Sequence, residues 1–311
     1  MIALLVVLAA LGLDRFLGEW PNRLHPVVWM GIAVKAAERR APTAGRAAPF
    51  IYGLAMALIL PAACGATAWA TVSLPLVGPI LAVLWLKSTF AVRALGVAGR
   101  GVSGPLATGD LHGAREGLRS LCSRDPRALG PDELAAGAVE SLAENASDSV
   151  VAPLSWFVVG GLLGSGALAP AVAAAVAYRA VNTLDAMVGY HGRYEWLGKA
   201  SARLDDLANL VPARLTAVLL LVGGAGSGAS VRSGVTTMVR DRGNTESPNA
   251  GWPMAAMAGL LGVRLEKPGH YALGSGRAPT AADVEVAWII VVRGLGVGGI
   301  VGGLALGWAG W

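Results

Sequence analysis

Long apolar runs alternate with polar stretches along this chain, and the lengths of the runs indicate its fold. Five runs of 17 to 28 residues carry at most two charged side chains each: 50–74, 77–95, 150–177, 215–231 and 286–311. A helix needs about 20 apolar residues to cross about 30 Å of hydrocarbon. The pattern therefore predicts an all-α, polytopic integral membrane protein with about five or six hydrophobic helices.

The polar stretches indicate how the chain is oriented in the membrane. Residues 75–79 alone separate the first two runs, and their two prolines predict a tight helical hairpin. The polar stretches on either side of this hairpin, 20–49 and 96–149, then share one side of the membrane. Each holds five Lys or Arg residues, so the positive-inside rule places them in the cytoplasm. Residues 1–13 lack a preceding basic region and predict an uncleaved first helix.

Glycines interrupt two of the apolar runs. The centre of the run 150–177 contains Gly160, Gly161, Gly164, Gly166 and Pro170. We expect two half-helices here, folded as a broken or re-entrant hairpin that returns the chain to the cytoplasmic side; a single crossing is the alternative. In the last run, Gly294, Gly298 and Gly302 share one helical face. They predict close packing within the chain in preference to a homodimer contact.

The composition excludes several classes of protein. Hydrophobic residues make up 54% of the 311 residues and charged residues only 14%, whereas soluble domains carry roughly 25% charge. The net charge of +5 fits cytoplasmic loops. The sequence has no stripe of basic residues interleaved with aromatics, so nucleic-acid binding is not predicted. Cys64 and Cys122 form neither a metal motif nor a disulfide framework. Without repeats or low-complexity linkers, residues 1–311 are predicted to form one polytopic domain, with site-bearing polar stretches at 96–149, 178–214 and 232–285.

Acidic residues recur where a polar helix meets the membrane. Residues 134–145 read as a helix entered through Pro131, and Glu140, Glu144 and Asp148 follow every four residues, with Asn145 beside them. Like charges at this spacing repel, so a cation, basic side chains or a shared proton should compensate them. A solvated helix face is the alternative interpretation.

Two further polar clusters follow the run 150–177. Arg179, Asn182 and Asp185 are spaced by three, and the second cluster contains Arg203, Asp205, Asp206, Asn209 and Arg214. Carboxylate and amide oxygens that converge from separate helices are ligands that Mg²⁺ prefers, and arginines suit phosphate or carboxylate groups. A fourth polar segment, 247–252, contains Asn249 and reads as a turn before a small-residue helix, whose free N-terminus could hold an anion.

Taken together, these segments resemble the cobalamin biosynthesis protein CobD/CbiB family. The opening, 12–31, is similar to the start of that family. The closer matches are ESLAEN with Asp148 at 140–148, YRAVNTLDAMVGY at 178–190, ARLDDLAN at 202–209 and SPNAGWP at 247–253. The blocks occur in family order and lie within residues 12–31 and 115–271. Small departures, such as Ser149 and Met254, touch no candidate ligand.

The resemblance implies an adenosylcobinamide-phosphate synthase in the cell membrane, with its active site on the cytoplasmic side. Such an enzyme attaches (R)-1-aminopropan-2-ol O-phosphate to the free propionate of adenosylcobyric acid, with ATP as co-substrate and Mg²⁺ as cofactor, through an acyl phosphate in our hypothesis. Besides these substrates and the lipid bilayer, the expected partners include the enzymes of nucleotide-loop assembly; a homo-oligomer is left open. No nucleic acid is expected.

The candidate residues take their roles from this resemblance. Glu140, Glu144, Asp185 and Asp205 are the catalytic candidates, and Glu144, Asp148, Asp205 and Asp206 are the metal candidates. The substrate- and phosphate-binding candidates are Asn145, Arg179, Asn182, Arg203, Asn209, Arg214 and Asn249. Two alternatives are a UbiA-like intramembrane prenyltransferase, which also holds a Mg-diphosphate between acid-and-amide motifs, and a transporter with a broken-helix binding site.

Overall fold

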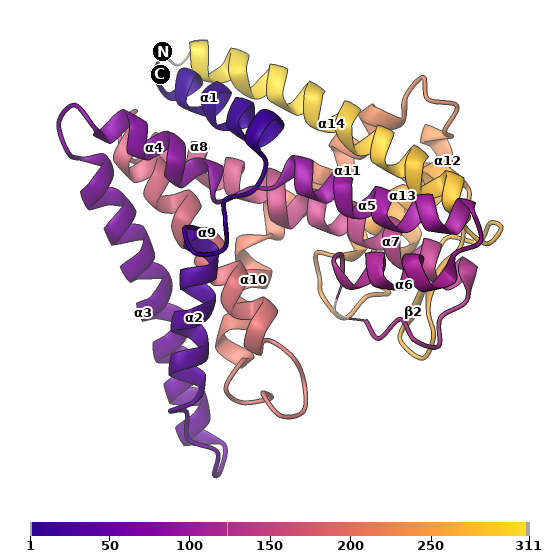
Figure 1. The fold of residues 1–311 in the computed structure, drawn as a ribbon, viewed down its shortest axis with the longest axis horizontal. Helices are drawn as coiled ribbons and strands as arrows, with labels where there is room; N and C mark the ends of the chain where they lie inside the picture. The colour runs from indigo at the N-terminus through magenta and orange to yellow at the C-terminus, as the bar shows by residue number, and fades with distance from the viewer. Residues whose placement is uncertain (1, 123, 309–311) are drawn as a thin grey trace. The chain divides into compact units, whose positions relative to one another are not determined.

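The computed structural model describes residues 2–122 and 124–308, and its chain forms two compact units. Unit 1 is formed mainly by the residues up to Ala91 and by Ala152–Asn209. Unit 2 contains Val92–Val151 and Leu210–Leu304. Both units are built almost entirely from helices, which confirms the predicted all-α membrane fold (Figure 1).

Unit 1 contains seven named helices in its described residues. They are α1 (Ile2–Leu17), α2 (Pro26–Glu38), α3 (Ala47–Val72), α4 (Gly78–Lys87), α8 (Ala152–Leu163), α9 (Leu168–Val188) and α10 (Lys199–Ala208). Helix α9 packs against both α3 and α8, and α10 contacts α3 and α9.

Unit 2 combines helices with one small hairpin. Its elements are α5 (Val92–Ala107), α6 (Leu111–Arg119), α7 (Pro131–Ala146), the π-helical turn η1 (Ser147–Val151), α11 (Leu210–Gly224), α12 (Val231–Asp241), α13 (Gly251–Leu261), β1 (Leu265–Lys267), β2 (Tyr271–Leu273) and nearly all of α14 (Ala281–Trp308). The two strands pair antiparallel, with Leu265 opposite Leu273.

Five helical segments of the described chain are long and apolar enough to cross a membrane. They are Ala47–Val72, Gly78–Ala107, Pro131–Leu163, Leu168–Val188 and Ala281–Gly303. Helices α10 and α11 form a bent pair that passes the same test together and could supply a sixth crossing. The predicted run 215–231 is shorter as a helix, because α11 ends at Gly224 and Gly226 and Gly228 adopt positive φ angles after it.

The break predicted within 150–177 lies between α8 and α9, at residues 164–167. Its two arms differ from the expected half-helices. The first arm continues the segment that begins at Pro131, and the second extends to Val188, so each is long enough to span a bilayer. The arms approach closely because Gly160 has no side chain: a Cβ there would lie 2.4 Å from the carbonyl oxygen of Pro170.

Helix α7 begins where the sequence predicts. Gly130 caps it, Pro131 occupies its first turn, and the backbone N–H of Gly130 donates to Glu133 at 2.8 Å. At Ser147 the α-helix widens into η1, so the four-residue acidic repeat does not continue on regular α-helical geometry to Asp148. Glu140 is buried, whereas Glu144 and Asp148 are only half-buried.

A buried ionic network joins α1 to α4 in unit 1. The Nζ atom of the fully buried Lys87 lies 3.2 Å from Asp14 and 3.1 Å from Glu19. His25 Nε2 lies 3.1 Å from Glu19, and its Nδ1 accepts the backbone N–H of Val27, which caps α2. His25 therefore has a structural role. Burial alone raises the pKa of Glu19, but hydrogen bonds with His25 and Lys87 bring that pKa below its ordinary value.

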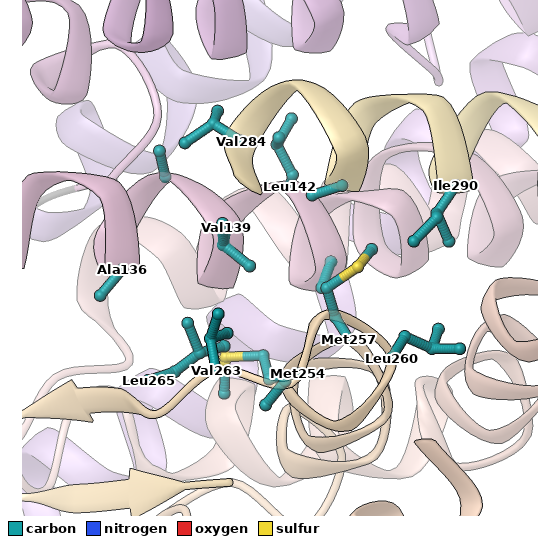
Figure 2. Close-up of a cluster of buried hydrophobic side chains, with 14 of the residues drawn as sticks. Ala136, Val139, Leu142, Met254, Met257, Leu260, Val263, Leu265, Val284 and Ile290 are labelled. Carbon is teal, nitrogen blue, oxygen red and sulfur yellow. The ribbon is translucent and has the colours of Figure 1, made fainter. Parts of the chain in front are cut away.

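The core of unit 2 lies between α7, α13 and α14. Figure 2 shows Val139 and Leu142 of α7 near Met257 of α13 and Val284 of α14. Gly294 and Gly298 of α14 pack inside the chain, as predicted: a Cβ on Gly294 would lie 2.4 Å from the carbonyl oxygen of Leu219 in α11, and one on Gly298 would lie 3.0 Å from the Leu219 side chain. The prediction is wrong for Gly302, where a Cβ would meet nothing within 4 Å. Close packing of small residues therefore holds this unit together.

Replacing Lys87 with methionine should lower the free energy of unfolding by about 3 kcal/mol, because Asp14 then stays buried without its cation. Thermal unfolding in detergent measures this change. The same substitution at the exposed Lys35 is the control, and adding Asp14→Asn to Lys87→Met should recover part of the lost stability. Equal unfolding temperatures for the Lys87 variant and the wild type would contradict the role of the pair.

Cysteine labelling separates two full crossings from a re-entrant hairpin. In a background with Cys64 and Cys122 replaced by serine, single cysteines at Asp132 and Arg193 should react from the same side of the membrane. A cysteine at the exposed Ser165, in the α8–α9 turn, should react from the opposite side. If Ser165 reacts only from the side that labels Asp132, the hairpin is re-entrant.

Candidate functional site

The predicted site residues are distributed over both units. Unit 1 carries Arg179, Asn182, Asp185, Arg203, Asp205, Asp206 and Asn209, and unit 2 carries Glu140, Glu144, Asn145, Asp148, Arg214 and Asn249. Within each unit the structure brings some of these side chains into direct contact.

Asp205 of α10 is the centre of the cluster in unit 1. Its Oδ1 accepts a hydrogen bond from Asn182 Nδ2 of α9 at 3.3 Å, and its Oδ2 accepts one from Asn209 Nδ2 at 3.0 Å. Both oxygens of the carboxylate are therefore oriented by amides, one from the facing helix and one from the end of its own helix. Of the predicted convergence of acids and amides from separate helices, the contacts here show one acid and two amides.

Tyr178 and Arg179 extend this cluster along α9. The buried hydroxyl of Tyr178 donates to Asn209 Oδ1 at 2.9 Å, and Arg179 Nη1 donates to Asn182 Oδ1 at 3.2 Å. These hydrogen bonds connect Tyr178 to Arg179 by way of Asp205. Because Tyr178 and Arg179 are neighbours in the chain, the connections form a closed ring. We call the five residues of this ring, Tyr178, Arg179, Asn182, Asp205 and Asn209, the Asp205 network.

The other predicted residues of unit 1 occupy different surroundings. Asp185 folds back over the end of α9, where its Oδ1 lies 1.9 Å from the position that a Cβ of Gly189 would take. Gly189 must therefore lack a side chain. Arg203 is exposed and lies 3.7 Å from Asp206 on the outer face of α10. This pair sits on the same helix as Asp205 and adds one cation and one further acid to that end of the unit.

Glu140 is the most buried acid of the predicted set in unit 2. Arg124, from the segment before α7, donates to its Oε2 at 3.2 Å, and the hydroxyl of Tyr271 from β2 also hydrogen-bonds to this carboxyl group. Burial and the carboxylates of Glu140 and Glu144 raise the pKa of Tyr271. Its hydroxyl therefore stays protonated and serves as a donor to Glu140.

Arg214 and Asn249 also meet in unit 2. Arg214 Nη1 lies 3.4 Å from Asn249 Oδ1, and its guanidinium group is 4.6 Å from the ring centre of Trp252. Arg242 approaches the same ring at 4.8 Å. The start of α13 therefore presents two cations and a buried amide, which suits an anionic ligand. Asn145, by contrast, donates within its own helix to the carbonyl oxygen of Ser141 at 2.9 Å.

The positions of the acidic side chains show how the expected Mg²⁺ could be held. In residues 2–122 and 124–308, no group of three or more His, Cys, Asp or Glu side chains is placed to hold a metal ion. A cage made by protein side chains alone is therefore not formed by the described residues. Mg²⁺ commonly binds through one or two carboxylates, with substrate phosphates and water as the other ligands. Asp205 and Asp206 stay the candidates for those one or two carboxylates, with Asp205 turned toward α9 and Asp206 toward Arg203.

Several residues in these contacts were not predicted as site residues. Tyr178 and Trp252 lie inside the resembling segments but read as apolar residues, and only their hydroxyl and ring contacts reveal their roles. Arg124 and Tyr271 lie outside every periodic pattern, and the hairpin that carries Tyr271 was not predicted. No signal in the spacing of the sequence identifies these two.

Comparison with known proteins shows the family of the chain. The model of the CobD/Cbib protein family matches residues 7–288. The chain belongs to the CobD/Cbib family. It is 39% identical to the cobalamin biosynthesis protein CobD of Dehalococcoides mccartyi over 298 residues, with 94% of each chain covered. No solved structure gives a significant match.

Two further CobD relatives support this membership. The protein of Geobacter metallireducens is 43% identical, with 84% of this chain and 80% of the relative covered. The protein of Rhodobacter capsulatus is 40% identical, with 86% and 83% covered. Family membership assigns the chain to cobalamin biosynthesis, and its apolar helices fit a multi-pass membrane protein.

A double-mutant cycle tests the Asp205 network. Tyr178→Phe leaves the Oδ1 atom of Asn209 without its buried donor and should lower the unfolding free energy by about 1 kcal/mol. Asn209→Ala should cost more, since it also removes a donor to Asp205. If the two side chains act together, the double variant loses less stability than the sum of the single losses; additive losses in thermal unfolding would exclude their coupling.

Proposed function

We propose that this protein is an ATP-dependent acid–amine ligase that joins (R)-1-aminopropan-2-ol O-phosphate to the free propionate of adenosylcobyric acid. The product is adenosylcobinamide phosphate. Family membership supports the pathway, and the Asp205 network is the observation that carries the proposed chemistry. That network supplies an oriented carboxylate, two amides and an arginine in one place, which suits a phosphate-bearing substrate.

The reaction needs an activated carboxyl group, because a carboxylate resists attack by an amine. In the proposed sequence, the propionate oxygen bonds to the γ-phosphorus of ATP and ADP leaves. The amine nitrogen then bonds to the carbonyl carbon of the acyl phosphate, inorganic phosphate leaves, and the nitrogen gives its proton to a carboxylate of the protein. Each step builds negative charge on phosphate oxygens, which positioned cations stabilise.

The residues of unit 1 suit the nucleotide phosphates. Asp205 and Asp206 would hold Mg²⁺, which when bound neutralises charge on the phosphates. Arg179 and Arg203 supply further positive charge, and Asn182 and Asn209 keep the Asp205 carboxylate in one orientation. We assign Asp185 to the candidates for the base that accepts the proton of the amine.

The residues of unit 2 suit the aminopropanol phosphate, and they include further acids that could act as the general base. Arg214, Arg242 and Asn249 at the start of α13 would bind the phosphate of the amine. Glu140, oriented by Arg124 and Tyr271, and Glu144 remain candidates for the general base; Glu144 with Asp148 also remains a candidate metal pair. We place these groups on the cytoplasmic side, where the positive-inside rule puts the flanking loops.

One assay tests the proposed function. The detergent-purified protein is incubated with adenosylcobyric acid, the aminopropanol phosphate and MgATP, and the amide product is detected by mass spectrometry. Product should require ATP and should disappear when Mg²⁺ is chelated. With verified substrates and folded protein, no product under these conditions would exclude the ligase, and prenyl diphosphates would be the next substrates to test.

Asp205→Asn should reduce turnover at least a hundredfold while the protein still inserts and folds, because the amide keeps the size of the side chain but removes its charge. Turnover is measured with the same assay, and folding by thermal unfolding. Glu116→Gln, at an exposed acid of α6, is the control and should keep wild-type activity. Full activity of the Asp205 variant would remove this carboxylate from the mechanism.

A further inference from the structure

A surface cavity of about 270 Å³ lies in unit 1, outside the Asp205 network. Two loops form it, one between α2 and α3 and one between α9 and α10. Its lining combines aromatic, acidic, basic and small residues: Glu38, Ala41, Pro42, Thr43, Gly45, Pro49, Gly192, Arg193, Tyr194, Glu195, Trp196 and Leu197. The volume suits one ring system better than a whole nucleotide or a corrin, since drug-sized ligands need about 300 to 1,000 Å³.

Cations surround the aromatic side chains of this cavity. The guanidinium group of Arg46 lies 5.4 Å from the ring centre of Trp196, and Lys199 Nζ lies 4.7 Å from it. Arg193 lies 5.1 Å from the ring centre of Tyr194. An aromatic wall flanked by cations can bind a planar ring and an attached anion together.

The acids of the cavity are already engaged by neighbouring donors. Glu38 Oε1 accepts hydrogen bonds from the Tyr194 hydroxyl at 2.8 Å and from Arg193 at 3.1 Å. Glu195 lies 2.8 Å from His191. Glu195 is also within Coulombic range of Lys199, so these acids offset part of the positive charge. Arg46, Arg193 and Lys199 still outnumber Glu38 and Glu195, and a purely cationic ligand is disfavoured.

Helix α10 connects the cavity with the Asp205 network inside the same unit. Lys199 begins this helix beside Trp196, and Arg203 and Asp206 follow on the same face at spacings of four and three residues. With a rise of about 1.5 Å per residue, Arg203 lies roughly 6 Å further along the helix and Asp206 roughly 10 Å. A chain of phosphates that starts at the cavity and follows this face would reach Arg203, and Asp206, being an acid, would meet those phosphates only through the Mg²⁺ of the proposed function.

We propose that the cavity receives the adenine ring of an adenosine group, stacked against Trp196 and Tyr194. The inference rests on the proposed function for the identity of this ligand. Two substrates of that reaction carry adenosine: ATP and the adenosyl group of the corrin. The row of cations along α10 favours ATP, because only ATP has phosphates to place on Lys199 and Arg203.

Base stacking and phosphate binding can be measured separately. Trp196→Leu keeps an apolar side chain but removes the ring, so it should weaken MgATP binding about tenfold and leave inorganic tripolyphosphate binding unchanged. Trp196→Tyr restores a stacking surface and should keep most of the affinity. Trp69→Leu, at an exposed tryptophan of α3, is the matched control. Binding is measured by calorimetry on detergent-purified protein without turnover.

The outcomes separate the possible occupants. Weaker binding of adenosylcobyric acid in Trp196→Leu, with unchanged ATP binding and unchanged binding of the corrin without its adenosyl group, would identify the corrin's adenosine as the occupant. Equal losses for ATP and tripolyphosphate, or no loss for either adenosine ligand, would overturn the proposal. Because binding is measured directly, unchanged affinities for both ATP and adenosylcobyric acid in an active ligase would refute the cavity alone, whereas a failed ligase assay would refute the proposed function.

Discussion

The close approach of helix backbones is the constraint on which the rest of this structure depends. In a bilayer, lipid tails are as apolar as leucine, so helices associate through packing and hydrogen bonds. Gly160 meets the backbone at Pro170 in unit 1, and Gly294 meets the backbone at Leu219 in unit 2. Contacts this close leave no room for a Cβ. Gly198 meets the carbonyl group of Val188 in the same way, which brings the start of α10 to the end of α9, the two helices whose Asn182 and Asp205 side chains reach each other.

Buried charge imposes a second constraint that joins fold and site. An ion in an apolar interior is tolerated only with a partner of opposite charge or with several hydrogen bonds. Lys87 meets this requirement through Asp14 and Glu19, and the result is a structural link between α1 and α4. Glu140 meets it through Arg124 and Tyr271. The same rule that stabilises α1 thus orients an acid that is a candidate for catalysis.

The sequence predicts those parts of the fold and site that follow a single period. Apolar runs located the spans, glycines located the α8–α9 break, and a spacing of three to four residues grouped Arg179 with Asn182 and Asp205 with Asn209. Contacts between distant segments leave no such pattern. Arg124 comes from a loop and Tyr271 from a strand of three residues, so only tertiary packing brings them to Glu140. Helix α2 was not predicted, because its 13 residues are too few to form a membrane-spanning run.

The Asp205 network also explains why amides, and not further acids, accompany the carboxylate. An ionised carboxylate offers about four lone-pair directions, and Asn182 and Asn209 use one on each oxygen. Two directions remain for a cation or a phosphate-bound water. Another acid in place of either amide would repel the Asp205 carboxylate and raise the free-energy cost of ionising it. The amides orient the charge of Asp205 without adding to it. On the proposed function, the missing ligands of Mg²⁺ then come from the substrate, so the metal site is completed only when the nucleotide binds.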